Sequence, residues 1–483
     1  MPVDLGPILN FLLPASVVSI AVSLISRALR RQIISGLYAS AVLASGTFLA
    51  YGMLIESSTI QITPSQLPAS VLLIDQISVY LSTISLGVIA VAAVYSLRYV
   101  HERMPEYFIL LLFLGVGMVG VFSSGDFVTF FVFWEVMSIS SYLLVAFNYK
   151  RWESVEASLK YLIMSSTGSA AILFGISLIY GMVGDLNFET LSKVMNGPPV
   201  SNEMWSTVAM VLIIGGLGVN SAMAPFHSWL PDAHPAAPSP VSAILSGVVI
   251  KTGIFFMFRL FSTMFPETAY GWSFIILSLA LLTMTIGNLL ALMQDDIKRL
   301  LAFSSVANIG YIVFAIGLHT ELAFTGGLLH VLNHAVSKAL LFLAAGCFIH
   351  TLGVRELSKL SGVARKMPVS GVCYAIGAFS LAGMPGLNVF VSEYTILYAA
   401  FQIGYYVPAA IMIFNILIGA MYHLRVIQIV FSKKEAEGID GAKEVSPIML
   451  VPLLALAGLS IAIGVYASPF LSASRLVATS LLG

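Results

Sequence analysis

Long apolar runs separated by short polar segments dominate this chain. Fourteen of the runs are long enough to cross about 30 Å of hydrocarbon as helices. They lie at residues 6–26, 33–55, 76–97, 107–123, 127–148, 156–183, 205–224, 240–264, 272–293, 300–318, 322–349, 369–402, 406–431 and 447–467. The pattern predicts an all-α, polytopic membrane protein with about fourteen transmembrane helices.

Proline and glycine interrupt two of these predicted spans. The seventh span runs into the proline-rich segment 224–235, and the twelfth is interrupted over residues 383–388. Proline removes a helical hydrogen bond, and backbone freed at membrane depth is tolerated only where protein or water satisfies it. Broken helices at matching positions predict two inverted five-helix repeats with a pathway between them. A purely structural kink is the alternative at either break.

The repeats and the basic residues organise the chain. Predicted parts are three N-terminal helices over 1–106, a first repeat over 107–264, a second over 272–431 and a C-terminal helix over 432–483. Alternate loops and adjoining helix ends carry 17 of the 23 lysines and arginines, and the opposite ones carry three. Because cytoplasmic loops hold the excess of basic residues, both termini are predicted to face outward.

Composition excludes several classes of protein. Hydrophobic residues make up 58% of the 483 residues and charged residues 10%, with a mean hydropathy of +0.96; soluble domains usually have about 25% charged residues. The net charge is zero, so nothing favours nucleic acid as a partner. Cys347 and Cys373 lack the spacing of iron–sulfur or zinc ligands, and we expect neither a metal nor a redox cofactor.

Ionisable side chains inside the apolar runs carry the functional signal. Such a group near the bilayer centre costs at least about 2.5–3.5 kcal/mol, so a chain that keeps several is predicted to use them to move charge. The candidates for a proton pathway are Glu135, Lys160, Lys251, His330, His334, Lys338 and Glu393. Three of them recur at every fourth residue from 330 to 338, which predicts a relay along one helix face.

Other interpretations of single residues stay open. Burial disfavours the charged form of both Glu135 and Lys251, so each is predicted either to exchange a proton or to belong to a fixed ion pair. Glu393, beyond the second break, is either a proton site toward the outer side or a cap of the following half-helix. The loop at the first break carries further polar residues that can form an access route, namely His227, Asp232 and His234.

Several long motifs resemble those of one protein family. Segments 225–234, 238–243, 250–252 and 330–342 are similar to the signature of the antiporter-like membrane subunits of respiratory complex I, Mrp-type sodium/proton antiporters and energy-converting hydrogenases. The resemblance covers nearly the whole chain. Residues 390–393 are most similar to hydrogenase-type and related archaeal or bacterial complexes, in which a carboxylate replaces a lysine.

The resemblance implies a half-channel in each repeat, joined by a central hydrophilic axis. Glu135 matches the family's fifth-helix carboxylate, Lys251 its eighth-helix lysine and Glu393 its twelfth-helix site; the group from His330 to Lys338 continues the axis. The family's seventh-helix lysine aligns with Asn220, which cannot carry a proton charge in the physiological range. Asn220 is therefore a possible weak point of the first half-channel.

The function implied is that of a proton-translocating or sodium/proton-exchanging subunit of a multisubunit respiratory or hydrogenase-type complex in a prokaryotic cell membrane. Implied partners are other antiporter-like and small membrane subunits, and peripheral subunits that carry out electron transfer, because this chain has no redox-cofactor motif. The alternative, motivated by Asn220, is a non-conducting structural or coupling subunit of the same kind of complex. A freestanding secondary carrier is a third and weaker possibility.

Overall fold

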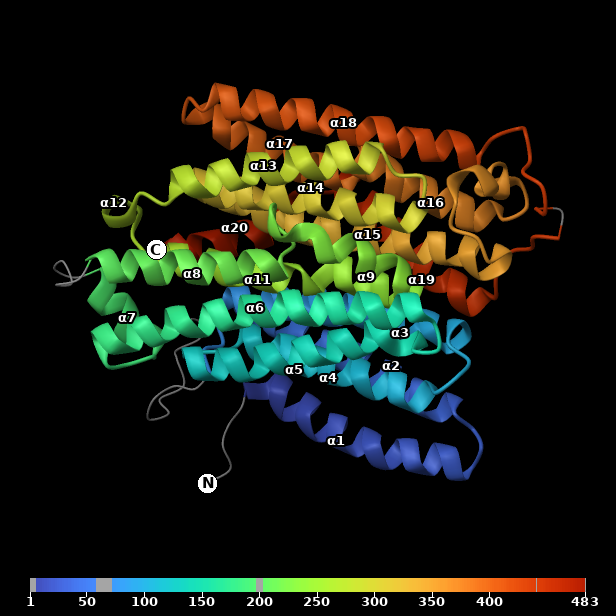
Figure 1. Ribbon diagram of the computed structural model, residues 1–483, viewed down its shortest axis with the longest axis horizontal. Coiled ribbons are helices and arrows are strands. Elements are labelled where there is room, and N and C mark those ends of the chain that lie inside the picture. Colours follow the sequence, from blue (N-terminus) through green and yellow to red (C-terminus); the bar gives the residue numbers. More distant parts are fainter. Residues whose placement is uncertain (1–5, 58–71, 197–202, 440, 483) are drawn as a thin grey trace.

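The computed structural model describes residues 6–57, 72–196, 203–439 and 441–482, which form a bundle of helices running in both directions along one axis (Figure 1). The α-helices are α1 (Gly6–Ala28), α2 (Ile33–Ser57), α3 (Gln76–Tyr99), α4 (Met104–Phe122), α5 (Phe127–Val145), α6 (Trp152–Val183), α7 (Phe188–Met195), α8 (Glu203–Asn220), α9 (Leu230–Ala236), α10 (Ser239–Ile244), α11 (Lys251–Thr263), α12 (Glu267–Tyr270), α13 (Ser273–Leu292), α14 (Ile297–Leu318), α15 (Glu321–Leu352), α16 (Pro368–Leu381), α17 (Asn388–Gln402), α18 (Tyr406–Val430), α19 (Pro447–Val465) and α20 (Ser468–Leu482).

The all-α, multi-pass membrane architecture is confirmed. Twelve helical segments of the described chain are long and apolar enough to cross a membrane, and α8 and α16 are shorter apolar helices that end at the two expected breaks. The number of crossings, the two inverted repeats and the boundaries of the four parts stay predictions. Helix α15 lies at the centre, where it packs against α3, α10, α14, α16, α17, α19 and α20.

At the first break the protein itself satisfies the freed backbone. Helix α8 ends at Asn220, and the chain turns before a 3-10 helix, η2 (Phe226–Trp229), leads into α9. The indole nitrogen of Trp229 donates to the carbonyl of Val219 (2.8 Å), and the hydroxyl of Thr283 accepts from the amide of Ala224 (3.1 Å). Because these partners come from inside the bundle, irregular backbone is stable here at membrane depth.

At the second break one asparagine holds four helices together. Asn388 is the first residue of α17, and its side-chain oxygen accepts hydrogen bonds from the hydroxyls of Ser337 on α15 (3.2 Å), Ser380 on α16 (2.5 Å) and Ser460 on α19 (2.7 Å). Its amide nitrogen donates to the carbonyl of Asn333 (3.0 Å). The break is thus a fixed junction of neutral polar groups.

The last span differs from the prediction of one helix ending at residue 467. Helix α19 ends at Val465, and α20 follows after two residues and packs along α15 and α3. Contacts midway along α20 are the hydroxyl pair of Ser474 with Tyr80 (3.0 Å) and the ion pair of Arg475 with Glu321 (2.8 Å). Serines and an arginine lower the hydropathy of this second segment, which is why the apolar pattern alone missed it.

The predicted basic loops gather at one end of the bundle, the inward end. Ion pairs connect them there, including Lys150 with Glu102 (3.1 Å) and Arg355 with both Glu153 (2.9 Å) and Asp296 (3.2 Å). The ends of α1 and α20 that lie nearest the two termini point toward the opposite, outward end (Figure 1). Which end faces the cytoplasm stays a prediction.

Candidate functional site

Lys251 lies in the buried centre without a carboxylate partner. It begins α11 directly after a π-helical turn, η3 (Leu245–Val249), and its side chain is almost completely buried at 3% exposure. A π turn widens the helix and often marks a functional site. The ammonium donates to the carbonyl of Gly247 and lies 3.4 Å from that of Ser246. These carbonyls bind the amine but do not neutralise its charge.

Lys251 and Lys338 bind the same small group of neutral residues. The Lys338 ammonium on α15 donates to the carbonyl of Leu301 on α14 (2.9 Å), which also accepts from the hydroxyl of Ser305 (2.8 Å). The hydroxyls of Ser305 and Ser246 are 2.6 Å apart. Lys251 and Lys338 are therefore joined through neutral groups, and their charges are near enough to act on each other.

His330 and His334 continue this line on the same face of α15, as the four-residue spacing predicted. Both rings are fully buried, with centroids 6.2 Å apart. The ring nitrogens of His330 are 3.0 Å from the hydroxyl of Ser392 and 3.1 Å from the side-chain oxygen of Asn308. Among the described residues, neither ring nitrogen of His334 has a hydrogen-bond partner, although the charges of both lysines act on the ring.

Glu393 ends the line on the far side of the second break. It directly follows Ser392, the partner of His330, and its side chain is 3% exposed. One carboxylate oxygen has no hydrogen-bond partner, and the other faces the glycine turn at Gly383. Glu393 lies in the second turn of α17 and makes no capping hydrogen bond, which favours the interpretation as a proton site over that as a cap.

Two buried residues lead from this line toward the inward end. His234, from the loop at the first break, is fully buried and stacks on Phe342 at a centroid distance of 4.6 Å. The ammonium of Lys298 donates to the carbonyls of His234 (3.1 Å) and Ala237 (2.6 Å). The sequence pattern counted Lys298 among the loop lysines, because only its packing distinguishes it from the half-exposed Arg299 beside it.

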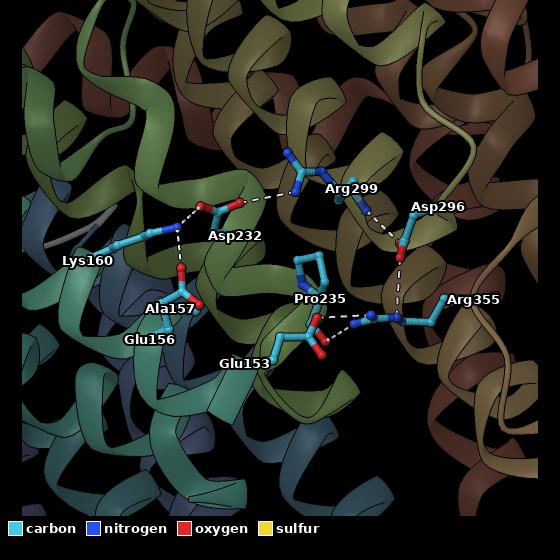
Figure 2. Close-up of a pocket in the computed structure, with 9 residues that line it drawn as sticks. All are labelled: Glu153, Glu156, Ala157, Lys160, Asp232, Pro235, Asp296, Arg299 and Arg355. Atoms are coloured by element: carbon cyan, nitrogen blue, oxygen red, sulfur yellow. Dashed lines mark hydrogen bonds and ion pairs between the residues drawn. The ribbon is translucent and has the colours of Figure 1, made fainter. Parts of the chain in front are cut away.

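Lys160 does not belong to the buried line, and its predicted position among hydrocarbon is wrong. Its side chain is 50% exposed and forms ion pairs with Glu156 (2.9 Å) and Asp232 (3.1 Å). Figure 2 shows these groups around a cavity of about 200 Å³, where Asp232 also meets Arg299. A lysine held by two carboxylates in this open cavity avoids the cost of burial, so its presence in an apolar helix did not indicate a buried charge.

In the described ranges, no hydrogen bond or ion pair joins the remaining candidates to the line. Glu135 on α5 is half-buried and accepts a hydrogen bond from Ser169 on α6 (2.7 Å); in the described ranges no ion pair joins it to a lysine. Asn220 is buried at the end of α8, and neither its side-chain oxygen nor its nitrogen has a protein partner. His227 is half-buried, with its ring 6.2 Å from that of Phe303.

The described part of the chain offers no obvious metal centre. No group of three or more histidine, cysteine, aspartate or glutamate side chains there is arranged to hold an ion, and Cys347 and Cys373 are buried, unpaired thiols. The side chains of the buried line are themselves groups that can bind and release protons. Its order along the bundle is Lys298, His234, Lys338, Lys251, His334, His330 and Glu393.

Comparisons with known proteins agree with this geometry. The profile of the family described as NADH:quinone oxidoreductase/Mrp antiporter, transmembrane region, matches residues 124–419. The chain belongs to this family. It is 29% identical to F(420)H(2) dehydrogenase subunit N of Methanosarcina mazei over 88% of this chain and 87% of that one. It is 28% identical to a Na(+)/H(+) antiporter subunit of Alkalihalophilus pseudofirmus over 98% and 97% of the two chains.

A chain of a solved membrane complex has the same fold as this protein. A chain of the membrane-bound sulfane sulfur reductase, an archaeal respiratory membrane complex, superposes with a TM-score of 0.89 at 29% identity, covering 98% of both chains. The expected resemblance to antiporter-like membrane subunits is thus confirmed. The functional roles of the individual site residues stay predictions.

Proposed function

We propose that this chain is a proton-translocating membrane subunit of a multisubunit respiratory complex in a prokaryotic cell membrane. Its relatives are named as subunits of a dehydrogenase and of a sodium/proton antiporter, and its structural neighbour belongs to a respiratory membrane complex. Partner subunits carry out electron transfer, and this chain couples that reaction to ion movement. Further antiporter-like and small membrane subunits are its expected neighbours in the membrane.

The observation that carries the proposal is the pair of buried lysines without carboxylates, Lys251 and Lys338. Two ammonium groups in a poorly polarisable interior repel each other, so a proton on one raises the cost of a proton on the other. The hydroxyls of Ser305 and Ser246 lie between them, but the carbonyl of Leu301 only accepts hydrogen bonds, so a proton that crosses between the two lysines needs water beside these hydroxyls. Alternating protonation of the two lysines moves one charge through the centre of the bundle.

Sodium exchange is a second candidate function, favoured by the similarity to an antiporter subunit over almost the full length. The described line consists of amines and imidazoles, with one carboxylate at its end. Hard cations such as sodium prefer oxygen ligands, whereas amines and imidazoles bind and release protons. The chemistry of the line therefore favours protons as the transported ion.

The test is proton pumping by the intact complex reconstituted in vesicles. Lys251→Ala and Lys338→Ala are expected to abolish proton movement driven by electron transfer while the complex still assembles. Lys193→Ala is the matched control, because Lys193 is exposed at the outward end and forms an ion pair with Glu189 (2.7 Å). Unchanged pumping in both buried variants would contradict the proposal and favour a non-conducting structural or coupling subunit.

A further inference from the structure

The inward end contains a large cavity that reaches a buried lysine. The cavity has a volume of about 620 Å³ and lies between the ends of α3 and α15 and the turn after α9. Its lining includes ionisable side chains that contact bulk water, among them His101, Glu102 and His350. Lys298 also contributes to the lining, although its side chain is almost completely buried. Water that enters the cavity from the inward end can thus reach the amine of Lys298.

Lys298 is held in a manner unlike the other basic residues of this end. Its ammonium binds two backbone carbonyls, those of His234 and Ala237, and makes no ion pair within the described ranges. The charges that act on it come from Arg355, Asp296, Glu153 and Arg151, and Arg355 forms ion pairs with both Glu153 and Asp296. Lys298 is therefore a charged amine bound by neutral oxygens, as Lys251 and Lys338 are.

His234 connects this amine to the central line. Its ring stacks on Phe342, which lies one turn beyond Lys338 on α15, and neither ring nitrogen has a protein partner. The charges of both Lys298 and Lys338 act on the ring. The Lys338 ammonium in turn binds the carbonyl of Leu301, three residues and about 4.5 Å of helix rise after Lys298 on α14. All three groups therefore gather around one turn of α14.

We propose that Lys298 and His234 form the inward proton-uptake branch of the line, through which protons pass from the inward cavity to Lys338. The ammonium of Lys298 transfers a proton to the imidazole of His234 and becomes a neutral amine, which takes a new proton from water in the cavity. The imidazolium of His234 then protonates the amine of Lys338 and returns to its neutral form. This inference rests on the proposed function and assigns the uptake route for the same protons.

A structural role is the competing explanation for Lys298. Its ammonium satisfies two carbonyls near the C-terminal end of α9, and cations stabilise helix C-termini. The substitution Lys298→Arg distinguishes this structural role from proton transfer. The arginine guanidinium keeps the charge and several donors but cannot lose a proton in a protein. An arginine at position 298 can still bind the two carbonyls, so a structural role would be kept. It cannot release a proton to His234, so proton transfer would stop.

The experiment measures proton pumping and thermal stability of the intact complex for Lys298→Arg and His234→Phe. The second substitution keeps a ring to stack on Phe342 and removes both nitrogens. We expect each variant to lose most of its proton pumping and to keep the melting temperature of the parent complex. Lys359→Arg is the control, because Lys359 is exposed at the same end and pairs with Glu356 (2.7 Å).

Normal pumping by Lys298→Arg together with His234→Phe would overturn the proposed branch. That result can be distinguished from failure of the proposed function, since Lys251→Ala and Lys338→Ala would then still stop pumping. If Lys298→Arg assembles poorly, His234→Phe alone decides: retained pumping overturns the branch, and lost pumping in a stable complex supports it.

Discussion

At the scale of single residues, the partner of each amine separates the buried line from the charged surface. Lys251, Lys298 and Lys338 bind backbone carbonyls, whereas Lys160 binds two carboxylates. A carboxylate partner fixes the charge of a lysine, but a carbonyl stabilises the proton without supplying an opposite charge. The three carbonyl-bound lysines are therefore the ones expected to change protonation during transport.

Asn220 provides the first prediction at this scale. Its side chain is buried, and in the described ranges neither its oxygen nor its nitrogen bonds to a residue of the line from Lys298 to Glu393. Asn220→Lys is therefore expected not to increase proton pumping, and the added ammonium near α11 would oppose protonation of Lys251. The measurement is the number of protons moved per electron pair in vesicles, with Asn220→Gln as the uncharged control. A gain in the lysine variant would show that the native half-channel is impaired.

At the scale of helices, the break between α16 and α17 packs against the break between α19 and α20. Near the end of α19, Gly464 lies directly against the backbone of Gly386 and Leu387. The Asn388 junction links the same helices through Ser460. Since Glu393 follows on α17, the contact between these breaks fixes the position of the last carboxylate of the line. The packing of the two breaks and the position of Glu393 are thus expected to change together.

Substitution of glycines in α19 tests this arrangement. A methyl group at Gly464 would collide with backbone atoms, whereas at Gly458 it would meet open space. Gly464→Ala is expected to destabilise the packing by about 1–3 kcal/mol and to lower both the melting temperature and the pumping rate. Gly458→Ala is expected to keep both values, because alanine favours a helix. Equal behaviour of the two variants would contradict a fixed contact between the breaks.

At the scale of the whole molecule, the two ends of the bundle differ in charge and in access to water. The inward end carries the basic loops and the cavity next to Lys298, and α1 and α20 point their terminal ends the other way. Both native cysteines are buried, so an added cysteine would be the main accessible thiol. The chain is therefore suited to labelling from either side of the membrane.

Single cysteines can determine the sidedness of the bundle. Glu437→Cys lies in the loop after α18 at the inward end, and Thr268→Cys lies in α12 at the other end; both positions are exposed. In sealed, right-side-out cells, we expect a membrane-impermeant thiol reagent to modify the cysteine at 268 but not that at 437. The reverse pattern would contradict the predicted orientation, and with it the direction of proton uptake through Lys298.

The sequence predicted much of this structure, for identifiable reasons. The spacing of His330, His334 and Lys338 is a property of one helix, so a linear pattern was sufficient to place them on one face. The partners of Lys160 and Lys298 depend on how α9 packs against α6 and α14, and no spacing within one helix encodes that contact. Pro469, near the start of α20, was an available signal for the broken last span.

Ordered water along the buried line tests the central claim most directly, and a structure of the assembled complex at a resolution that shows water would provide it. Buried polar atoms normally have a hydrogen-bond partner, either protein or ordered water. The unpartnered nitrogens of His234 and His334 and the free oxygen of Glu393 are therefore expected to bind water. We predict a continuous chain of water and side chains from Lys298 to Glu393. Dry, separated side chains along this line would contradict proton transfer through it.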